Sequence, residues 1–222
     1  MKNFIKANRG FIVFMLCFGL FRVAVADWNT IPSGSMRPNL LEGDVVFVNR
    51  LAYDLKVPLT DIAVAHLDDP ERGDIVTFSS PSNGTRLIKR IIALPGDRVE
   101  MRNDVLYVNS RKAEYSAPEI LSEPSENGGA FKAMRVTETI GHDTRRVQLL
   151  AGVPAKRSFG PAVVPSGKYL MLGDNRDNSA DSRYFGFVPR QLLIGRAERV
   201  LVSADIKGDW LPRLKRFGQR LQ

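Results

Sequence analysis

Residues 86–109, "RLIKRIIALPGDRVEMRNDVLYVN", decide the fold class of this chain. The run 86–94 is apolar and rich in isoleucine, and the turn sequence PGD follows it, as expected at the end of a β-strand. Residues 98–109 predict a hairpin that turns at Asn103 and Asp104. This part of the chain therefore predicts short antiparallel strands.

Similar strand signals stand on both sides of this stretch. Residues 43–48, "GDVVFV", and 73–78, "GDIVTF", are β-branched runs introduced by Gly-Asp. Further runs follow at 167–174, "GKYLMLGD", and 192–204, "LLIGRAERVLVSA". Long amphipathic helical patterns are absent from this region, so we predict a mainly β fold.

Residues 110–164 differ from their surroundings. The stretch 117–129, "APEILSEPSENGG", is rich in Pro, Ser, Glu and Gly, and the sequence after it has only weak periodicity. We interpret 110–164 as an inserted smaller lobe, so that sequence on both sides of it completes one core.

The composition excludes several functions. The 222 residues carry 32 Lys and Arg against 24 Asp and Glu, and this charge of +8 favours an anionic neighbour such as a membrane surface. No basic cluster with stacking aromatics and no zinc-finger spacing occurs, which argues against nucleic-acid binding. The single cysteine, Cys17, permits no intrachain disulfide, and His66 and His142 stand in unrelated contexts. We therefore predict no metal site.

The N-terminal segment 10–26, "GFIVFMLCFGLFRVAVA", is apolar except for Arg22. Three basic residues precede it and the first acidic residue is Asp27, which predicts a transmembrane anchor with a cytoplasmic N-terminus. As a helix the segment is about 25 Å long, slightly short of a hydrocarbon core of about 30 Å. The alternative is a signal peptide cleaved after Ala26, and self-cleavage at that "AVA" is a related hypothesis.

The octet 31–38, "IPSGSMRP", lies just beyond this segment. Gly34 permits a tight turn between Ser33 and Ser35, so one hydroxyl and its own backbone N–H can face the same space. A serine nucleophile needs a base, and Lys89 lies between aliphatic neighbours in its predicted strand. Burial there lowers the pKa of a lysine and makes it a candidate base. The plain alternatives are a surface turn and a half-exposed lysine.

With "MLGDNRDNSADSRYFGFVP", residues 171–189, the octet and the lysine strand closely resemble bacterial type I signal peptidase, also called leader peptidase. The resemblance covers about residues 22–50, 72–109 and 165–203. It implies an antiparallel β catalytic core and a membrane-anchored serine protease that removes signal peptides from exported preproteins. It also implies a Ser/Lys dyad that needs no cofactor.

The resemblance implies a role for each matching residue. Ser35 is the nucleophile, Lys89 is the general base, and the Ser33 hydroxyl joins the Ser35 amide in an oxyanion hole. Ser179 hydrogen-bonds the lysine amine and orients it. The supporting positions are an ion pair of Asp181 and Arg183, with Gly173 and Asp174 at the start of the same box.

Specificity in the family follows the Ala-x-Ala rule for the residues before the cut. Substrate is expected to bind extended along a strand edge. Leu87 stands where an aromatic residue is common in relatives, which often have a second membrane segment and a disulfide in the lobe as well. The positions that match two shallow apolar pockets are Ile31, Pro32, Met36, Leu40, Leu87 and Ile88.

The implied location is the bacterial inner membrane, with one pass and an extracytoplasmic catalytic domain. The expected partners are preprotein signal peptides, membrane lipids and a nearby secretion translocon. The tail is predicted to be a membrane-surface helix or a solvated terminus. The expected parts are 1–9 (cytoplasmic), 10–26 (anchor), 27–109 and 165–205 (catalytic core), 110–164 (lobe) and 206–222 (basic amphipathic tail).

Three rival functions have distinguishing features. A conjugative pilus maturation peptidase would keep the dyad but diverge more in "GDNRDNSADSR". A membrane-anchored binding protein would hold signal peptides without cutting them. An autoproteolytic repressor would need a helix-turn-helix at its N-terminus, where this chain has its apolar segment.

Overall fold

The computed structural model describes residues 6, 8–57, 60, 62–124 and 129–221. The described strands form four sheets, and the largest has seven strands in the order β1-β2-β16-β5-β6-β14-β15. All of its strand pairs are antiparallel, so the predicted mainly β class is confirmed. The bounds are β1 (Ala26–Thr30), β2 (Asp44–Asn49), β16 (Leu193–Ser203), β5 (Ile75–Ser79), β6 (Arg86–Ala93), β14 (Lys168–Leu172) and β15 (Val188–Pro189).

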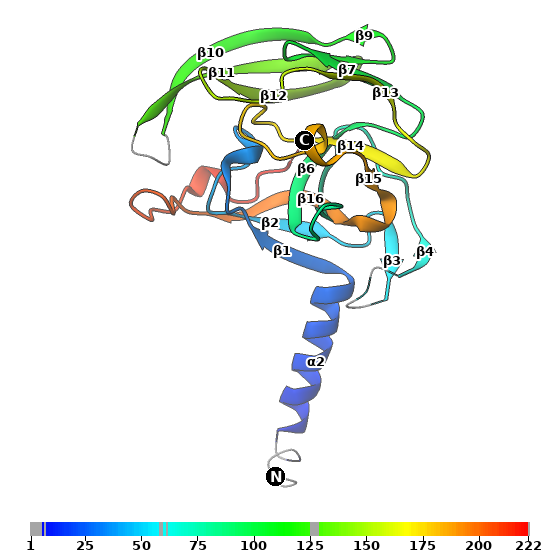
Figure 1. The fold of residues 1–222 in the computed structure, drawn as a ribbon. Helices are drawn as coiled ribbons and strands as arrows, with labels where there is room; N and C mark the ends of the chain where they lie inside the picture. Colours follow the sequence, from blue (N-terminus) through cyan, green and yellow to red (C-terminus); the bar gives the residue numbers. More distant parts are fainter. Residues whose placement is uncertain (1–5, 7, 58–59, 61, 125–128, 222) are drawn as a thin grey trace.

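Three smaller sheets contain the other described strands, in the orders β13-β7-β8-β9, β10-β11-β12 and β3-β4. In Figure 1 the first two of these lie across the top of the molecule, above the seven-stranded sheet. Their strands are β13 (Phe159–Val163), β7 (Arg98–Arg102), β8 (Val105–Val108), β9 (Arg111–Lys112), β10 (Glu114–Pro124), β11 (Ala130–Ile140), β12 (Asp143–Leu150), β3 (Asp54–Lys56) and β4 (Ala63–His66).

The hairpin predicted around residue 103 is confirmed. Strands β7 and β8 pair with Arg102 opposite Val105. The two residues between them, Asn103 and Asp104, have φ values of 48° and 66°. This left-handed region is one that Asn and Asp tolerate better than most residues, because their short side chains bond locally.

The N-terminal helix α2 (Arg9–Ala24) projects from the sheets at the start of β1 (Figure 1). It ends before residue 26 because Ala26 already pairs with Asn49 in β1 and is buried. The helical stretch is therefore shorter than the expected 10–26. Over the described part of the chain, no helix has both the length and the apolar character needed to cross a membrane. The transmembrane anchor thus stays a prediction.

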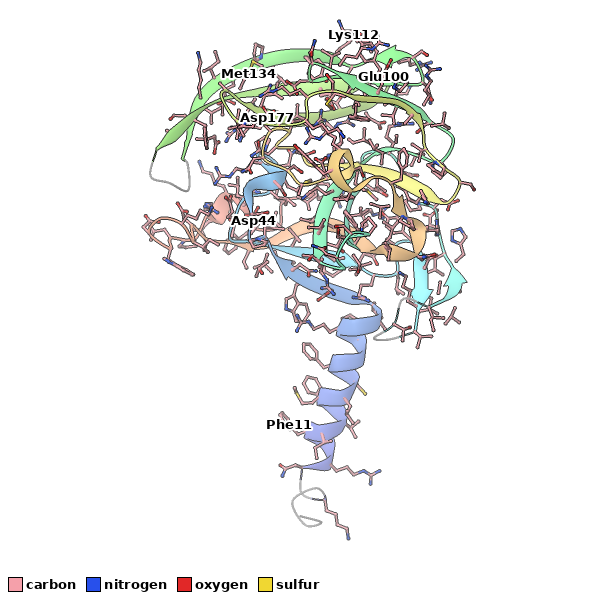
Figure 2. All side chains as sticks on the ribbon, in the orientation of Figure 1. Phe11, Asp44, Glu100, Lys112, Met134 and Asp177 are labelled. Carbon is pink, nitrogen blue, oxygen red and sulfur yellow. The ribbon has the colours of Figure 1, made fainter. Side chains whose placement is uncertain are left out.

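The lobe contains long strands where the sequence indicated only weak periodicity. Nine residue pairs join β10 to β11, and eight join β11 to β12. The inner face of this sheet buries charged side chains, among them Glu138 and Arg145. Charged residues on a buried face remove the apolar–polar alternation that identifies a strand in sequence. Figure 2 shows Met134 at the outer side of this sheet and Asp177 beneath it.

A buried carboxylate ties the lobe to the core. Both Glu138 oxygens accept hydrogen bonds from Arg176, at 2.7 Å each, and further bonds come from Arg145 Nε and the Tyr115 hydroxyl, also at 2.7 Å. Burial alone would raise the pKa of Glu138, but Arg176 and Arg145 lower it to about 2. Arg176 comes from the segment after β14, so this cluster joins two parts of the chain that are distant in sequence.

The C-terminal tail folds back onto β16. Isolated bridges pair Ala204 with Pro212 and Arg199 with Arg220, and the short 3₁₀ turn η3 (Leu214–Arg216) lies between them. Within 206–221 the tail forms no longer helix than this turn. Of the two alternatives for the tail, the described residues do not form the membrane-surface helix, because their backbone pairs with β16 instead.

The Glu138 cluster predicts the effect of Glu138→Gln. The change leaves two buried guanidinium groups without their counter-charge, so we expect the free energy of unfolding to fall by about 3–5 kcal/mol in urea denaturation at neutral pH. The wild-type advantage should be full above pH 4.5 and disappear as the pH falls toward 2, because protonation removes the same charge.

The matched control is Glu119→Gln on β10, where the exposed pair of Glu119 and Arg146 should contribute less than about 1 kcal/mol. Equal losses in the two variants would contradict the account of the buried cluster.

Candidate active site

Ser35 lies in the 3₁₀ turn η1 (Gly34–Met36), whose three residues are all buried. Ser33, which precedes this turn, has an extended backbone with φ −135° and ψ 155°. A Cβ at Gly34 would lie 3.1 Å from Glu42 Oε1 and 3.3 Å from the Arg37 side chain. A larger residue at position 34 would therefore require this ion pair to shift by a few tenths of an ångström.

Asn175 binds this turn through two hydrogen bonds. Its backbone N–H donates to the Ser35 carbonyl at 3.1 Å, and its side-chain Nδ2 donates to the Gly34 carbonyl at 3.0 Å. No role was predicted for Asn175 from the sequence, although this residue stands inside "GDNRDNSADSR". Its position between Asp174 and Arg176 was the sequence feature that could have identified it as a site residue. The turn is thus fixed by a segment about 140 residues later in the chain.

Lys89 lies on β6 and reaches the Ser35 hydroxyl. Its Nζ is 2.7 Å from Ser35 Oγ and donates a second bond to the Ile88 carbonyl at 2.9 Å. Ser35 is 8% exposed and Lys89 is 3% exposed. Burial lowers the pKa of Lys89 to about 8, while the negative charges of Asp181 and Asp174 oppose that shift. A lysine with this pKa is partly neutral near pH 8 and can accept a proton.

The two carboxylates near Lys89 are each bound to an arginine. Asp174 accepts bonds from Arg90 Nε at 2.9 Å and Nη2 at 2.8 Å, and both residues are 1% exposed. Asp181 accepts bonds from Arg183 Nε and Nη2 at 2.8 Å each, so the expected ion pair is formed. Arg90 was not predicted to be a site residue. It follows Lys89 and points to the other face of β6, as alternation along a strand requires.

Gly173 lies where the box passes closest to Ser35. A Cβ at this position would collide with Ser179 Oγ and lie 2.6 Å from the Ser35 carbonyl oxygen. Its N–H donates to Asp181 Oδ2 at 3.0 Å. Glycine is therefore required there by close approach of the backbone.

The expected hydrogen bond from Lys89 to Ser179 is not formed in this structure. Ser179 Oγ is buried and has no hydrogen-bond partner among the described residues. Lys89 Nζ instead uses the Ile88 carbonyl as its second acceptor. Ser33 is exposed at the start of the turn, next to Gly34. The structure thus brings Ser35 and Lys89 together, with exposed Ser33 preceding the turn and Ser179 packed against Gly173.

The expected pocket positions fall into three groups. Ile31, Met36 and Leu40 belong to a buried apolar cluster with β2 and β16 and are at most 2% exposed, and half-buried Ile88 packs against it. Leu87 packs against a second cluster. Pro32 is exposed.

No group of three or more His, Cys, Asp or Glu side chains with metal-site geometry occurs among the residues that the structure describes. His66 lies on β4 near Asp54 and Arg190, and His142 lies in the turn between β11 and β12. The group that contacts Ser35 Oγ is therefore the amine of Lys89.

Comparison with known proteins gives a consistent family. Residues 2–202 match the family described as Signal peptidase, peptidase S26. The chain is 33% identical to Signal peptidase I of Buchnera aphidicola subsp. Schizaphis graminum, over 94% of this chain and 77% of that protein. It is 37% identical to Signal peptidase I of Pseudomonas aeruginosa, over 85% and 69% respectively.

A crystal structure of a signal peptidase I from Enterococcus faecalis V583 shares 36% identity, covers 59% of this chain and 97% of that one, and has a TM-score of 0.35. The family match spans most of the chain and includes the Ser35 turn, β6 and the box after β14. The chain therefore belongs to the signal peptidase family, peptidase S26, and is a serine peptidase.

Proposed function

We propose that this chain is a membrane-anchored endopeptidase that removes N-terminal signal peptides from exported preproteins after Ala-x-Ala sites. Ser35 is the nucleophile and Lys89 is the general base. The observation that carries the proposal is the 2.7 Å contact between two buried groups, Ser35 Oγ and Lys89 Nζ. A lysine whose pKa is lowered to about 8 by burial has the acid–base character that this role needs.

The reaction follows from these two groups. Neutral Lys89 accepts the Ser35 hydroxyl proton as Oγ bonds to the carbonyl carbon, and the carbonyl electron pair moves onto its oxygen. The tetrahedral intermediate collapses when the protonated lysine donates to the departing amine, which releases the mature protein. Neutral Lys89 then takes a proton from the water that attacks the acyl carbon, and the Oγ–carbon bond breaks as the protonated lysine returns that proton to Ser35 Oγ. The signal peptide leaves as a carboxylic acid, which loses its proton to solvent.

Two serine hydroxyls assist these steps. The exposed Ser33 hydroxyl and the Ser35 backbone N–H stabilise the developing oxyanion. Ser179 Oγ, which has no hydrogen-bond partner among the described residues, is available to orient the lysine amine. Gly173, Asp181 and Arg183 hold this segment in place through the contacts described above.

Substrate specificity comes from the apolar residues around the turn. The proposed pockets accept only small side chains at the first and third positions before the cut. We assign the walls of these pockets to the six expected pocket residues. Because Met36 and Leu40 are already fully buried, they would close the floor of these pockets. The neighbours that complete the set are Ile31, Pro32, Leu87 and Ile88.

Helix α2 supports the membrane location. Its apolar side chains face outward rather than into the sheets, with Phe11, Phe14 and Leu16 each more than 60% exposed (Figure 2). Exposed apolar side chains on a helix of this kind indicate a lipid contact. We propose that α2 anchors the chain in the bacterial inner membrane, with the sheets on the extracytoplasmic side, near the translocon that delivers preproteins.

The substitution Ser35→Ala tests the function. We expect wild-type protein in detergent to cut a preprotein after the second alanine of its Ala-x-Ala site, and the variant to be slower by about a thousandfold or more. Mass spectrometry of the products measures both the rate and the site. Ser82→Ala, at an exposed loop serine, is the control and should cut normally.

If wild type and both variants bind the preprotein without cutting it, the chain is a binding protein instead.

The pH dependence of kcat/KM tests the base. Because Lys89 must be neutral to accept a proton, kcat/KM for a fluorogenic Ala-x-Ala peptide should rise with pH through an apparent pKa of about 8. Steady-state rates across that range measure it. An acid limb near 10.5, the ordinary value for a lysine, would contradict the assignment, as would an active Lys89→Ala variant.

A further inference from the structure

A cavity of about 290 Å³ lies beside the Ser35 turn. One wall consists of the turn itself and the opposite wall comes from the lobe, through Phe131 of β11 and Gln148 and Leu150 of β12, with Asn175 between them. In Figure 1 the blue turn after β1 lies below the green strands of the lobe. The lobe thus forms part of a space that opens at the nucleophile.

Two of the lining residues carry buried amides, and each amide has one side-chain atom without a hydrogen-bond partner among the described residues. Gln148 is 1% exposed and Asn175 is 2% exposed. Gln148 Oε1 accepts from Arg135 Nε at 2.9 Å, and a guanidinium can only donate, so the amide orientation is fixed with Nε2 on the other side. Asn175 Nδ2 donates to the Gly34 carbonyl, which fixes its Oδ1 in the same manner.

Neither Gln148 Nε2 nor Asn175 Oδ1 has a hydrogen-bond partner in the described chain. Buried polar groups are normally paired, so each unpaired one calls for an explanation such as a functional role or a bound water. The free donor and the free acceptor match the carbonyl and the N–H of a peptide backbone. The cavity therefore has the hydrogen-bonding groups that an extended peptide would satisfy.

The position of the cavity indicates which part of a substrate reaches it. The residues expected to face side chains before the cut, Ile31, Met36 and Leu40, pack toward β2 and β16, and none of these three lines the cavity. A peptide that crosses Ser35 with its signal-peptide side over that cluster continues toward the lobe with the residues that follow the cut.

We infer that this cavity binds the first residues of the mature protein, after the scissile bond, and that Gln148 of the lobe is a substrate-positioning residue there. The inference rests on the proposed function and adds a role for the inserted lobe. Gln148 donates to a backbone carbonyl on the leaving side, and Asn175 accepts from a backbone N–H.

The lining also indicates which side chains fit. The charged side chains of the lining are paired with one another: Arg37 bonds Glu42 at 2.8 Å and also Glu123, and Lys207 lies 3.2 Å from Glu42. Paired charges of both signs give little preference for a charged substrate residue. Phe131 and Leu150 form the apolar part of the wall, so the cavity takes uncharged residues of limited size.

The test compares two substrates with the same residues before the cut. One continues with several residues after it, and the other carries only a p-nitroanilide leaving group. In Gln148→Met we expect KM for the extended peptide to rise about three- to tenfold, the loss of one hydrogen bond, while kcat/KM for the anilide stays at the wild-type level. The control is Gln191→Met, at an exposed glutamine of η2 (Arg190–Leu192).

A second variant tests the wall without touching the amides. Phe131→Ala should cut extended peptides with a large residue directly after the scissile bond faster than wild type does, and leave the anilide unchanged. Equal changes on both substrates in Gln148→Met, or no change on either, would overturn the inference while leaving the proposed function intact. Failure of wild type to cut either substrate would overturn both.

Discussion

The burial of the Lys89 ammonium beside Ser35 is the constraint on which the rest of the site depends. A lysine in water would stay charged near neutral pH, and only removal from solvent lowers its pKa toward 8. The nearby carboxylates would cancel that effect if they were free to pair with it. Asp174 and Asp181 are instead bound by Arg90 and Arg183, which leaves the lysine amine facing the serine hydroxyl.

This arrangement needs parts of the chain that are far apart in sequence. The Ser35 turn follows β1, Lys89 comes from β6, and the segment after β14 binds the turn through Asn175 and binds β6 through Asp174, which accepts from Arg90. The lobe is locked to that same segment by Glu138 and Arg176 and by the bond from Leu150 N to Asp177 at 2.7 Å. A displacement of the lobe would therefore also displace the Ser35 turn through this segment.

The resemblance to signal peptidases carried the expectation that Ser35 and Lys89 act together, because each local pattern alone also fits a surface turn or a half-exposed lysine. The turn at Asn103 and Asp104 could be predicted from the local sequence, because its residue types favour a left-handed backbone. The lobe strands could not be predicted in this way, because Glu138 and other charged residues occupy their buried face. Pairings such as Arg90 with Asp174 depend on which strands become neighbours, and a local pattern does not contain that information.

The central claim is tested most directly by an NMR titration of the protein with its lysine Cε carbons labelled with ¹³C. Lys89→Met identifies the Lys89 signal by its absence. The account predicts one lysine that titrates near pH 8 in the wild type and is missing from the variant. If every lysine signal titrates near 10.5, Lys89 is charged at neutral pH and the proposed base is wrong.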